Sequence, residues 1–344
     1  MTNTEKLELL GAPGSPYTRK MLALLRYRQI PHRILWGGHQ DPPKGYPSPK
    51  VRLLPTFYFQ ASDGTLEAAV DSTPITRRLE TDHEGRSVIP ADPELAFYND
   101  LIEDYADEWL TKAMFHYRWY HEVDRKNAGP LLIYWSVNTA SKDMAEATAQ
   151  AFTKRQYDRL YVVGSNDVTA QTIEESYARF IRILDGLIAI RGYVLGARPS
   201  SADFAIYGQL TQLGIIEPTS AKLMTDLSFR VRAWLDRMED LSGLDPDEDD
   251  WFTPAEARTA LKPLLGEIGR VYAPFLLGNA AAAAAGNDTV NTEIDSRAWT
   301  QPTFPYQAKC LMALRNVFNA LPDDTRSDIL ETLSDTGCET LFVN

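Results

Sequence analysis

The chain has 344 residues, of which 44% are hydrophobic and 24% are charged, a composition typical of a globular protein with two or three domains. Its formal net charge of −12 and its lack of a long basic run argue against nucleic acid and anionic membranes as partners. We find no apolar leader and no run of about 18 apolar residues, so we expect a cytoplasmic protein without a membrane span. The only cysteines, Cys310 and Cys338, predict no disulfide framework.

The chain up to about residue 80 alternates between strand and helix patterns. In order, we predict strand, helix, strand, strand, strand and helix over 7–10, 17–28, 32–36, 54–59, 65–68 and 71–79. Pro31 ends the first helix, and Pro55 lies near the start of its strand, where proline is tolerated. This order predicts an α/β domain.

Beyond a linker at 84–93, the spacing of apolar residues is almost entirely helical. We expect helices over 94–122, 142–162, 169–191 and 223–241, and a further helix that opens at 199–203. In this last segment, Ser200 and Asp203 have the spacing of a capping box, a folding signal. The remainder predicts helices over 253–287 and 306–321 and a hairpin over 290–301. We therefore expect domains at 5–83 and 94–243, followed by a helical or irregular extension at 244–344.

Four local patterns, in order, resemble the cytosolic glutathione transferase superfamily, of bacterial type with a serine at the helix start. They are Ser15-Pro-Tyr-Thr-Arg-Lys20, Leu54-Pro55 before an apolar strand, Asp71-Ser72 at a helix start, and the segment Gly196–Tyr207. The resemblance spans roughly residues 5–240. It implies a thioredoxin-like N-terminal domain with Pro55 in the cis form, and a helical glutathione-transferase C-terminal domain. The extension has no counterpart in the resemblance.

The resemblance implies an enzyme that activates the thiolate of glutathione for attack on a small hydrophobic electrophile. Glutathione would be the co-substrate, no metal would be needed, and the protein would be a homodimer. A glutathione-dependent isomerase, lyase or peroxidase, or a non-catalytic binding protein that keeps the fold, is the alternative. Position by position, the resemblance assigns the catalytic hydroxyl to Ser15, with Tyr17 and Thr18 as fallbacks.

One hydroxyl at a helix start is energetically sufficient for this task. Lowering the pKa of a free thiol, about 8.5, by two units requires roughly 2.7 kcal/mol. A charge-assisted hydrogen bond supplies about 1.5–3 kcal/mol, and a helix N-terminus adds about 0.3–1 kcal/mol. The simpler interpretation of Ser15 is a helix N-cap, with Pro16 in the first turn.

The same resemblance assigns the remaining glutathione contacts. The backbone of Leu54 next to Pro55 would pair with the peptide part, and Asp71 and Ser72 would bind the γ-glutamyl group at a helix N-terminus. Candidates for the glycyl carboxylate are Lys44, Lys50 and Arg52. The alternatives are a strand-edge proline, a helix cap and solvated surface charges.

Two further features have a structural and a functional interpretation. The aromatic run Phe115–His121 is first of all a core stripe; the alternative is a second-substrate pocket that includes His116 and Trp119. Cys310 is interpreted as a buried structural thiol. The spacing of the five histidines, at 32, 39, 83, 116 and 121, predicts no metal site.

Overall fold

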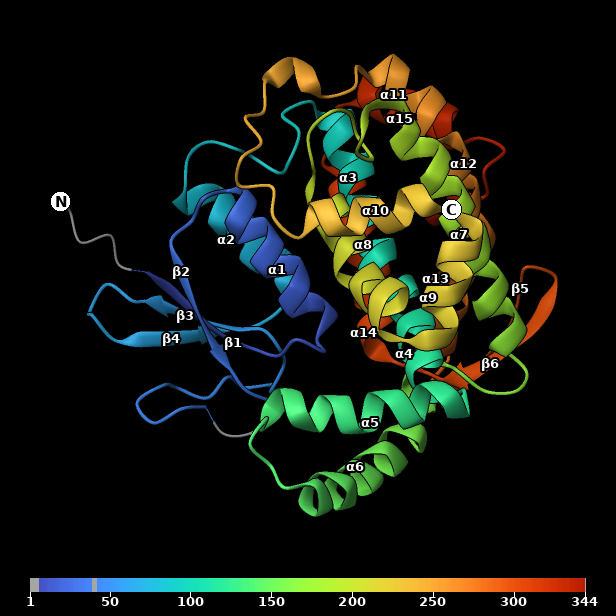
Figure 1. The fold of residues 1–344 in the computed structure, drawn as a ribbon. Helices are drawn as coiled ribbons and strands as arrows, with labels where there is room; N and C mark the ends of the chain where they lie inside the picture. The colour runs from blue at the N-terminus through green and yellow to red at the C-terminus, as the bar shows by residue number, and fades with distance from the viewer. Residues whose placement is uncertain (1–5, 39–41, 344) are drawn as a thin grey trace.

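The computed structural model describes residues 6–38 and 42–343. Its N-terminal part is a four-stranded sheet with two helices, which lies beside a larger helical part (Figure 1). The elements are β1 (Leu7–Gly11), α1 (Pro16–Tyr27), β2 (His32–Trp36), β3 (Thr56–Gln60), β4 (Leu66–Ala69) and α2 (Ser72–Asp82). The six predicted elements are thus confirmed, with shifts of at most a few residues at their ends. His39 lies outside the described residues.

The sheet has the strand order β2-β1-β3-β4. β1 runs parallel to β2 and antiparallel to β3, and β3 runs antiparallel to β4. Because side chains alternate along a strand, Leu9 and Phe57 join the main core with α1, whereas Leu10 and Tyr58 form a small cluster on the other face. This is the thioredoxin-like arrangement that the sequence predicts.

The central part of the chain is helical, as expected. It consists of α3 (Pro93–Tyr105), α4 (Thr111–Trp119), α5 (Glu122–Ser136), α6 (Lys142–Tyr157), α7 (Ala170–Arg191), α8 (Ser201–Thr211), α9 (Pro218–Leu227) and α10 (Phe229–Met238). Two π-helical turns, η1 (Ala106–Leu110) and η3 (Gln212–Ile216), and a 3-10 turn, η2 (Leu160–Val163), join some of them.

The C-terminal part adds a helical layer and one hairpin. Its helices are α11 (Pro254–Ala260), α12 (Lys262–Glu267), α13 (Ala273–Ala284), α14 (Pro305–Asn319) and α15 (Asp323–Leu333), with the short turns η4 (Glu248–Asp250), η5 (Ile268–Tyr272) and η6 (Cys338–Leu341). Strands β5 (Thr289–Ile294) and β6 (Arg297–Pro302) pair antiparallel. Asp295 and Ser296 both have positive φ, as a tight hairpin turn requires, which confirms the hairpin.

Four of the predicted helices are wrong in extent. The helix expected over 142–162 ends at Tyr157, and the one expected over 253–287 is interrupted at Leu261 between α11 and α12 and ends at Ala284. The helix expected over 94–122 ends at Trp119, and α5, which the sequence did not reveal, begins at Glu122. The helix expected over 223–241 is two helices, because Ser228 adopts an extended conformation and its hydroxyl caps α10 by accepting from the Val231 amide at 2.9 Å.

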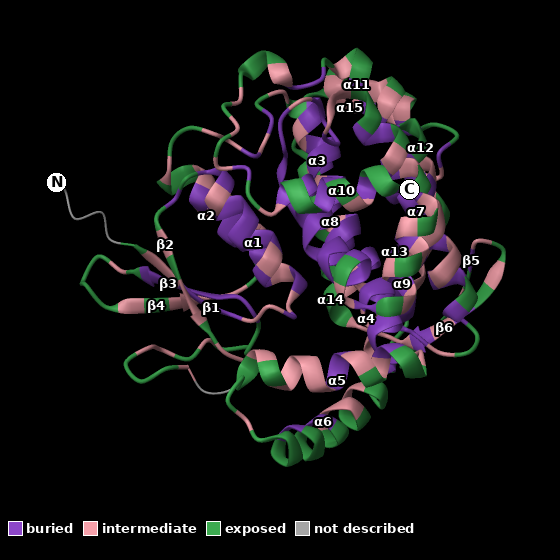
Figure 2. Cartoon of the chain, in the orientation of Figure 1, coloured by how far each residue is buried: buried purple, intermediate pink, exposed green. Residues whose placement is uncertain are grey.

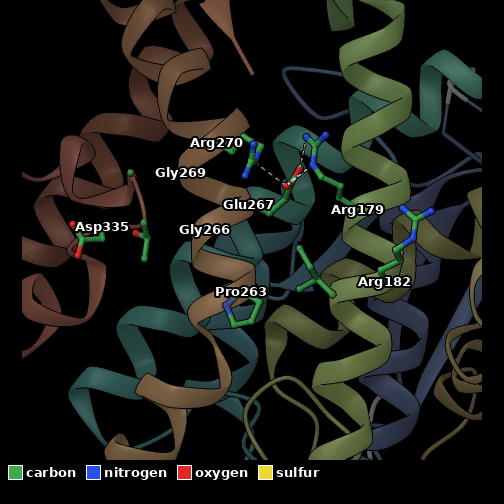
Figure 3. A pocket seen from close by; sticks show the side chains of 11 residues that line it. Arg179, Arg182, Pro263, Gly266, Glu267, Gly269, Arg270 and Asp335 are labelled. Atoms are coloured by element: carbon green, nitrogen blue, oxygen red, sulfur yellow. Dashed lines mark hydrogen bonds and ion pairs between the residues drawn. The ribbon is translucent and has the colours of Figure 1, made fainter. Parts of the chain in front are cut away.

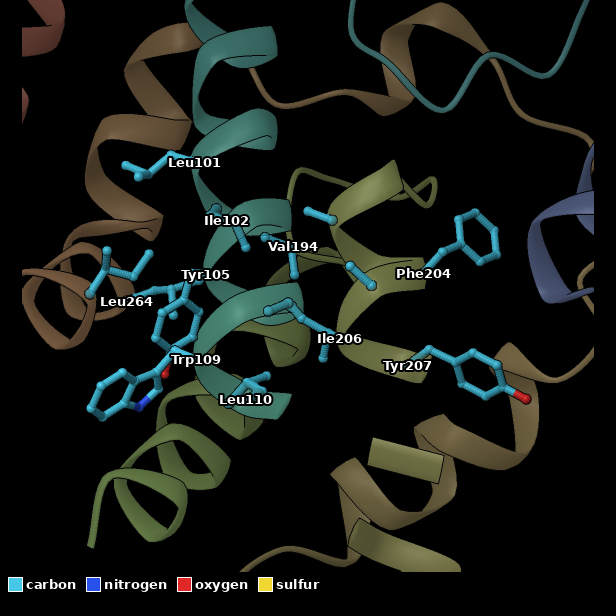
Figure 4. Packing of buried hydrophobic residues seen from close by; sticks show 14 of the residues in the cluster. Leu101, Ile102, Tyr105, Trp109, Leu110, Val194, Phe204, Ile206, Tyr207 and Leu264 are labelled. Atoms are coloured by element: carbon cyan, nitrogen blue, oxygen red, sulfur yellow. The ribbon is translucent and has the colours of Figure 1, made fainter. Parts of the chain in front are cut away.

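Helix α8 lies at the centre of the molecule. All of its residues are buried, which Figure 2 shows as a purple helix between α1 and α3. Figure 4 shows Tyr105 and Trp109 packing in the same cluster as Ile206 of α8 and Leu264 of α12. The capping box is confirmed: the buried Asp203 carboxylate accepts from the Ser200 amide at 2.9 Å, and burial raises its pKa to about 6.

The contact between α1 and α8 depends on a glycine. A Cβ at Gly208 would lie 2.5 Å from the Pro16 carbonyl oxygen and 3.0 Å from the Lys20 Cβ. We expect Gly208→Ala to lower the free energy of unfolding by about 1–3 kcal/mol, because backbone atoms must move apart. The matched control is Gly186→Ala on the exposed side of α7, where a Cβ meets nothing within 4 Å. That change should stabilise by about 0.5–1 kcal/mol. Urea unfolding measures both, and equal effects would contradict the packing argument.

Within residues 6–38 and 42–343, no helix is long and apolar enough to cross a membrane. Cys310 and Cys338 are both free and buried, so the interpretation of Cys310 as a buried thiol is confirmed. Burial raises the pKa of both thiols, that of Cys338 to about 12.

Candidate functional site

Ser15 lies at the N-terminus of α1, directly after the turn that leaves β1. Its hydroxyl oxygen accepts from the Thr18 amide at 3.2 Å and its hydroxyl donates to the Leu54 carbonyl at 3.3 Å. Ser15 is therefore the N-cap that the sequence predicts. The bond to Leu54 is long for a hydroxyl donor, so the proton is easily redirected toward a bound group.

The two fallback hydroxyls are already engaged. The Tyr17 hydroxyl donates to the Asp107 carbonyl at 2.8 Å, and burial, with the charges of Glu108 and Asp107, raises its pKa well above the usual value. The Thr18 side chain is fully buried and accepts from the Ala12 amide at 3.3 Å. Of the three hydroxyls, that of Ser15 is the one best placed to meet a ligand.

Side chains of the helical part hold the turn before Ser15 in place. Arg118 of α4 donates to the Gly14 carbonyl at 2.8 Å, and its guanidinium also contacts Glu217 and Gln212. Arg19 donates to the Pro13 carbonyl at 3.1 Å. A Cβ at Gly14 would lie 2.4 Å from the Leu132 side chain of α5, so a larger residue there would have to displace that side chain. The Ser15 hydroxyl is therefore presented by a rigid turn.

The peptide bond between Leu54 and Pro55 is cis, which confirms the expectation for this proline. The bond precedes β3 and brings the Leu54 carbonyl next to Ser15. Both residues are buried. Ser15 and the Leu54-Pro55 pair, 39 positions apart in sequence, are thus neighbours in the fold.

Asp71 and Ser72 lie at the start of α2. Asp71 has a φ of 80°, unusual for a residue other than glycine, and its carboxylate accepts from the Thr73 amide at 3.3 Å. Neighbouring atoms of the protein partly exclude water from the Asp71 carboxyl group, and this desolvation raises its pKa. The Ser72 hydroxyl accepts from the Lys20 ammonium at 3.1 Å, so its own proton remains for donation to an anion.

Lys20 connects Ser72 to a buried acidic pair. Its ammonium lies 2.8 Å from Glu103 and 2.6 Å from Asp107. Burial alone would raise the pKa of Glu103, but the charges of Lys20 and Arg77 outweigh it and lower that pKa. Burial raises the pKa of Asp107 in spite of Lys20. This network is not visible in the sequence pattern, because its members lie in α1, α2, α3 and η1.

The candidates for the glycyl carboxylate are all on the surface. Lys44 and Lys50 are exposed. Arg52 is exposed as well, and it lines a narrow pocket together with Leu54 and Thr56. Arg52 is therefore nearer to the Ser15 surface than the other two by its pocket neighbours.

Comparison with known proteins supplies the family. Residues 9–87 match the family model described as glutathione S-transferase, N-terminal domain. This N-terminal domain belongs to the glutathione S-transferase family. Ser15, Leu54, Pro55, Asp71 and Ser72 all lie within the matched residues. A search of curated proteins finds no match to the chain.

Several solved structures, glutathione transferases among them, are similar to the chain at low identity. One from Methylobacterium radiotolerans, in complex with glutathione sulfonate, is 17% identical, with 71% of this chain and 99% of that chain covered and a TM-score of 0.36. A Tau class enzyme from mango, Mangifera indica, is 17% identical over 75% and 98%, with a TM-score of 0.39. A β-etherase from a Sphingobium species is 19% identical over 68% and 95%, with a TM-score of 0.43.

The C-terminal extension reaches the glutathione S-transferase domain through α14. The negative charges of Glu108 and Asp71 add to burial in raising the pKa of Tyr306, in the first turn of α14. Gln307, the next residue, lies close enough to Glu108 to lower its pKa. Cys310 also lies close enough to Glu108, Asp104 and Asp71 for their charges to raise its pKa. The sequence pattern predicts a helix here but assigns none of its residues to the site.

Three titratable groups behind this helix have strongly shifted pKa values. Burial raises the pKa of Asp104 to about 7 and that of Glu108 to about 8, and it lowers the pKa of Lys112 to about 7. Shifted groups gather at functional sites more often than elsewhere. Asp104 also accepts from the Tyr272 hydroxyl at 2.5 Å, which ties the C-terminal part to α3.

The aromatic run at 115–121 belongs to the core, as first expected. Trp119 is buried beside Ala128 and Leu160, and His116 is fully buried. The alternative, a second-substrate pocket lined by Trp119 and His116, is wrong for these two side chains, because other side chains of the protein cover them.

A surface pocket of about 680 Å³ lies elsewhere, between α7 and the C-terminal segment (Figure 3). Its lining includes Arg179, Arg270, Glu267 and Asp335, but neither cysteine nor histidine. Arg179 donates to both Glu267 oxygens at 2.8 and 2.9 Å. The lining also includes Arg182, so its charges do not cancel, and none of its residues belongs to the Ser15 site.

Proposed function

We propose that the protein binds glutathione across the N-termini of α1 and α2 and activates its thiol for attack on a small electrophile. The observation that carries this proposal is the Ser15 hydroxyl, which lies 3.3 Å from the Leu54 carbonyl just before the cis-Pro55 bond. The match of residues 9–87 to the glutathione S-transferase N-terminal domain supports glutathione as the ligand.

In this proposal, Ser15 turns its proton from Leu54 toward the cysteinyl sulfur. The hydrogen bond and the N-terminus of α1 both favour the thiolate, so the thiol proton leaves to solvent near neutral pH. The sulfur lone pair then forms a carbon–sulfur bond to the electrophile. A leaving group departs with its electron pair, or, in an addition, the product takes up a proton.

The γ-glutamyl group fits the start of α2. The Ser72 hydroxyl and the amides of the first turn would donate to its carboxylate, and Lys20 adds positive charge behind Ser72. The Asp71 carboxylate would accept from its ammonium group. Arg52 and Lys50 are the proposed contacts of the glycyl carboxylate, with Lys44 as a further candidate.

The electrophile, in this proposal, binds between the Ser15 surface and the first turn of α14. Tyr306 supports this location, because its pKa responds to Asp71 of α2, Tyr17 of α1 and Glu108 of η1. Tyr306 is about half exposed, at 51%, and offers an aromatic surface to a small hydrophobic molecule.

A homodimer, expected from the resemblance, remains a prediction that light scattering can test.

Calorimetric titration with glutathione at pH 7 tests the proposal. We expect one site per chain, with binding in the micromolar to low millimolar range. Ser72→Ala should weaken this binding by roughly 5- to 10-fold, since it removes one hydrogen bond to a charged group. The matched control is Ser141→Ala, the exposed cap of α6, which should bind as the unchanged protein does.

Failure of the folded, unchanged protein to bind glutathione would overturn the proposed ligand. Binding that is equally strong in Ser72→Ala would contradict the proposed γ-glutamyl contact. Binding without turnover of any small electrophile would favour the non-catalytic alternative.

A further inference from the structure

Away from the Ser15 site, the fold brings two neighbouring histidines together with a glutamate that lies 58 positions after the first of them. His116 lies in the last turn of α4, His121 directly precedes α5, and Glu174 lies in the second turn of α7. One potential ligand atom of each lies within 4.8 Å of the other two. The spacing of histidines along the chain alone predicts no metal site. The third residue of the cluster, Glu174, becomes a neighbour of the two histidines only in the folded protein.

The distances in this cluster suit metal coordination. Oε1 of Glu174 lies 3.2 Å from Nε2 of His116 and 3.0 Å from Nε2 of His121. Ligand atoms at zinc bond lengths of about 2.0–2.2 Å on a tetrahedral centre lie roughly 3.3–3.5 Å apart. The two histidine nitrogens lie within 4.8 Å of each other, and the His121 and Glu174 side chains, 30% and 36% exposed, have room to move closer around an ion.

The two histidines are prepared as ligands. The His116 side chain is fully buried in the last turn of α4. Its Nδ1 lies 2.8 Å from the buried Ser165 hydroxyl. With the proton on Nδ1, this contact orients the ring and leaves the Nε2 lone pair toward Glu174, an arrangement common behind metal-binding histidines. Nε2 of His121 is buried and lies 3.0 Å from Oε1 of Glu174, but this contact lacks the geometry of a hydrogen bond.

The neighbouring acids have other partners. Asp124 accepts from the Thr219 amide at 2.9 Å and from its hydroxyl at 2.6 Å. Asp167 accepts from the Tyr120 hydroxyl at 2.8 Å. Glu174 is therefore the carboxylate that faces both histidines.

We propose that His116, His121 and Glu174 bind a divalent transition-metal ion of the zinc type. Two imidazole nitrogens favour such an ion over Mg²⁺ and Ca²⁺, which prefer oxygen ligands throughout. Three protein ligands leave a fourth position for water on the exposed side of His121 and Glu174. The ion would fasten the junction of α4 and α5 to α7.

Titration of chelator-treated protein with Zn²⁺ at pH 7 tests this site. We expect binding of one ion per chain. Glu174→Gln and His121→Asn, both at partly exposed positions, should each lower the affinity by more than 10-fold. Ser165→Ala should lower it by about 10- to 100-fold through loss of ring orientation. The matched control is His83→Asn, at the end of α2, which should bind Zn²⁺ like the unchanged protein.

Co²⁺ in place of Zn²⁺ supplies a second measurement. Its visible absorption should have the form of a tetrahedral nitrogen and oxygen site, and the spectrum should vanish in Glu174→Gln. The proposal is overturned if Zn²⁺ does not bind, or if it binds both ligand variants as tightly as the unchanged protein. In that case Glu174 is only a hydrogen-bond acceptor for the two rings.

Discussion

Replacing Ser15 with alanine should lower kcat/KM for glutathione and a chromogenic electrophile by roughly 10- to 100-fold. The change removes the one hydroxyl that faces the proposed sulfur position, and a hydrogen bond to a charged acceptor is worth about 1.5–3 kcal/mol. The pKa of bound glutathione should rise toward its free value of about 8.5, as measured by thiolate absorbance against pH. Glutathione affinity should change little, because Ser72, Asp71 and Leu54 remain.

The control for this variant must separate a cap from a catalytic hydroxyl. Ser15→Ala also removes the N-cap of α1, which costs about 1 kcal/mol of stability. Ser141→Ala removes a serine cap from α6 in the same way, away from the proposed site, and should leave kcat/KM unchanged. If Ser15→Ala loses stability but keeps both its activity and the low thiol pKa, Ser15 is only a cap. Tyr17→Phe and Thr18→Val would then be the next variants.

Local patterns were sufficient for the N-terminal domain because each signal lies within a few residues. Pro16 after Ser15 marks a helix start, and the apolar run after Pro55 marks a strand. The cis form of Pro55 was predicted by the family resemblance and not by propensity. The helical part was harder, because only two residues separate the end of α4 from the start of α5 and continuous helical spacing concealed the break.

The features that sequence patterns missed depend on contacts over long distances along the chain. Ser228 ends one helix and caps the next, and in sequence it resembles any polar residue on a helix surface. The π-helical turn η1 places the Asp107 carbonyl against Tyr17, which lies 90 residues earlier. Neither the approach of Tyr306 to Asp71 nor that of Glu174 to His116 has a local signal.

Lys20→Met should lower the free energy of unfolding at pH 7 by about 3–5 kcal/mol, the usual effect of leaving a buried charge without its partner. Lys20 is fully buried and is in contact with Ser72, Glu103 and Asp107. Glu103 would keep Arg77 at 3.1 Å, whereas Asp107 would lose its ion-pair partner. Urea unfolding followed by circular dichroism measures the change.

The matched control is Lys222→Met. Lys222 lies 2.5 Å from Asp226, but both side chains are mostly exposed. Such a surface pair contributes about 0.3–0.5 kcal/mol, so the control should remain close to the unchanged protein. Equal effects of the two substitutions would show that burial of the Lys20 network contributes nothing.

The loss caused by Lys20→Met should depend on pH in a definite direction. In the unchanged protein the pKa of Glu103 is lowered, so its contribution is complete above the unfolded pKa of about 4.3 and disappears as pH falls toward its folded value. Without Lys20, burial acts with less opposition, and the pKa values of Glu103 and Asp107 rise. The folded variant then binds more protons than its unfolded chain between about pH 4 and 7, and it gains stability as pH falls. The difference between the two proteins should therefore be smaller at pH 5 than at pH 7.

Addition of Asp107→Asn to Lys20→Met, which removes the unpaired charge, should recover part of the loss at pH 7.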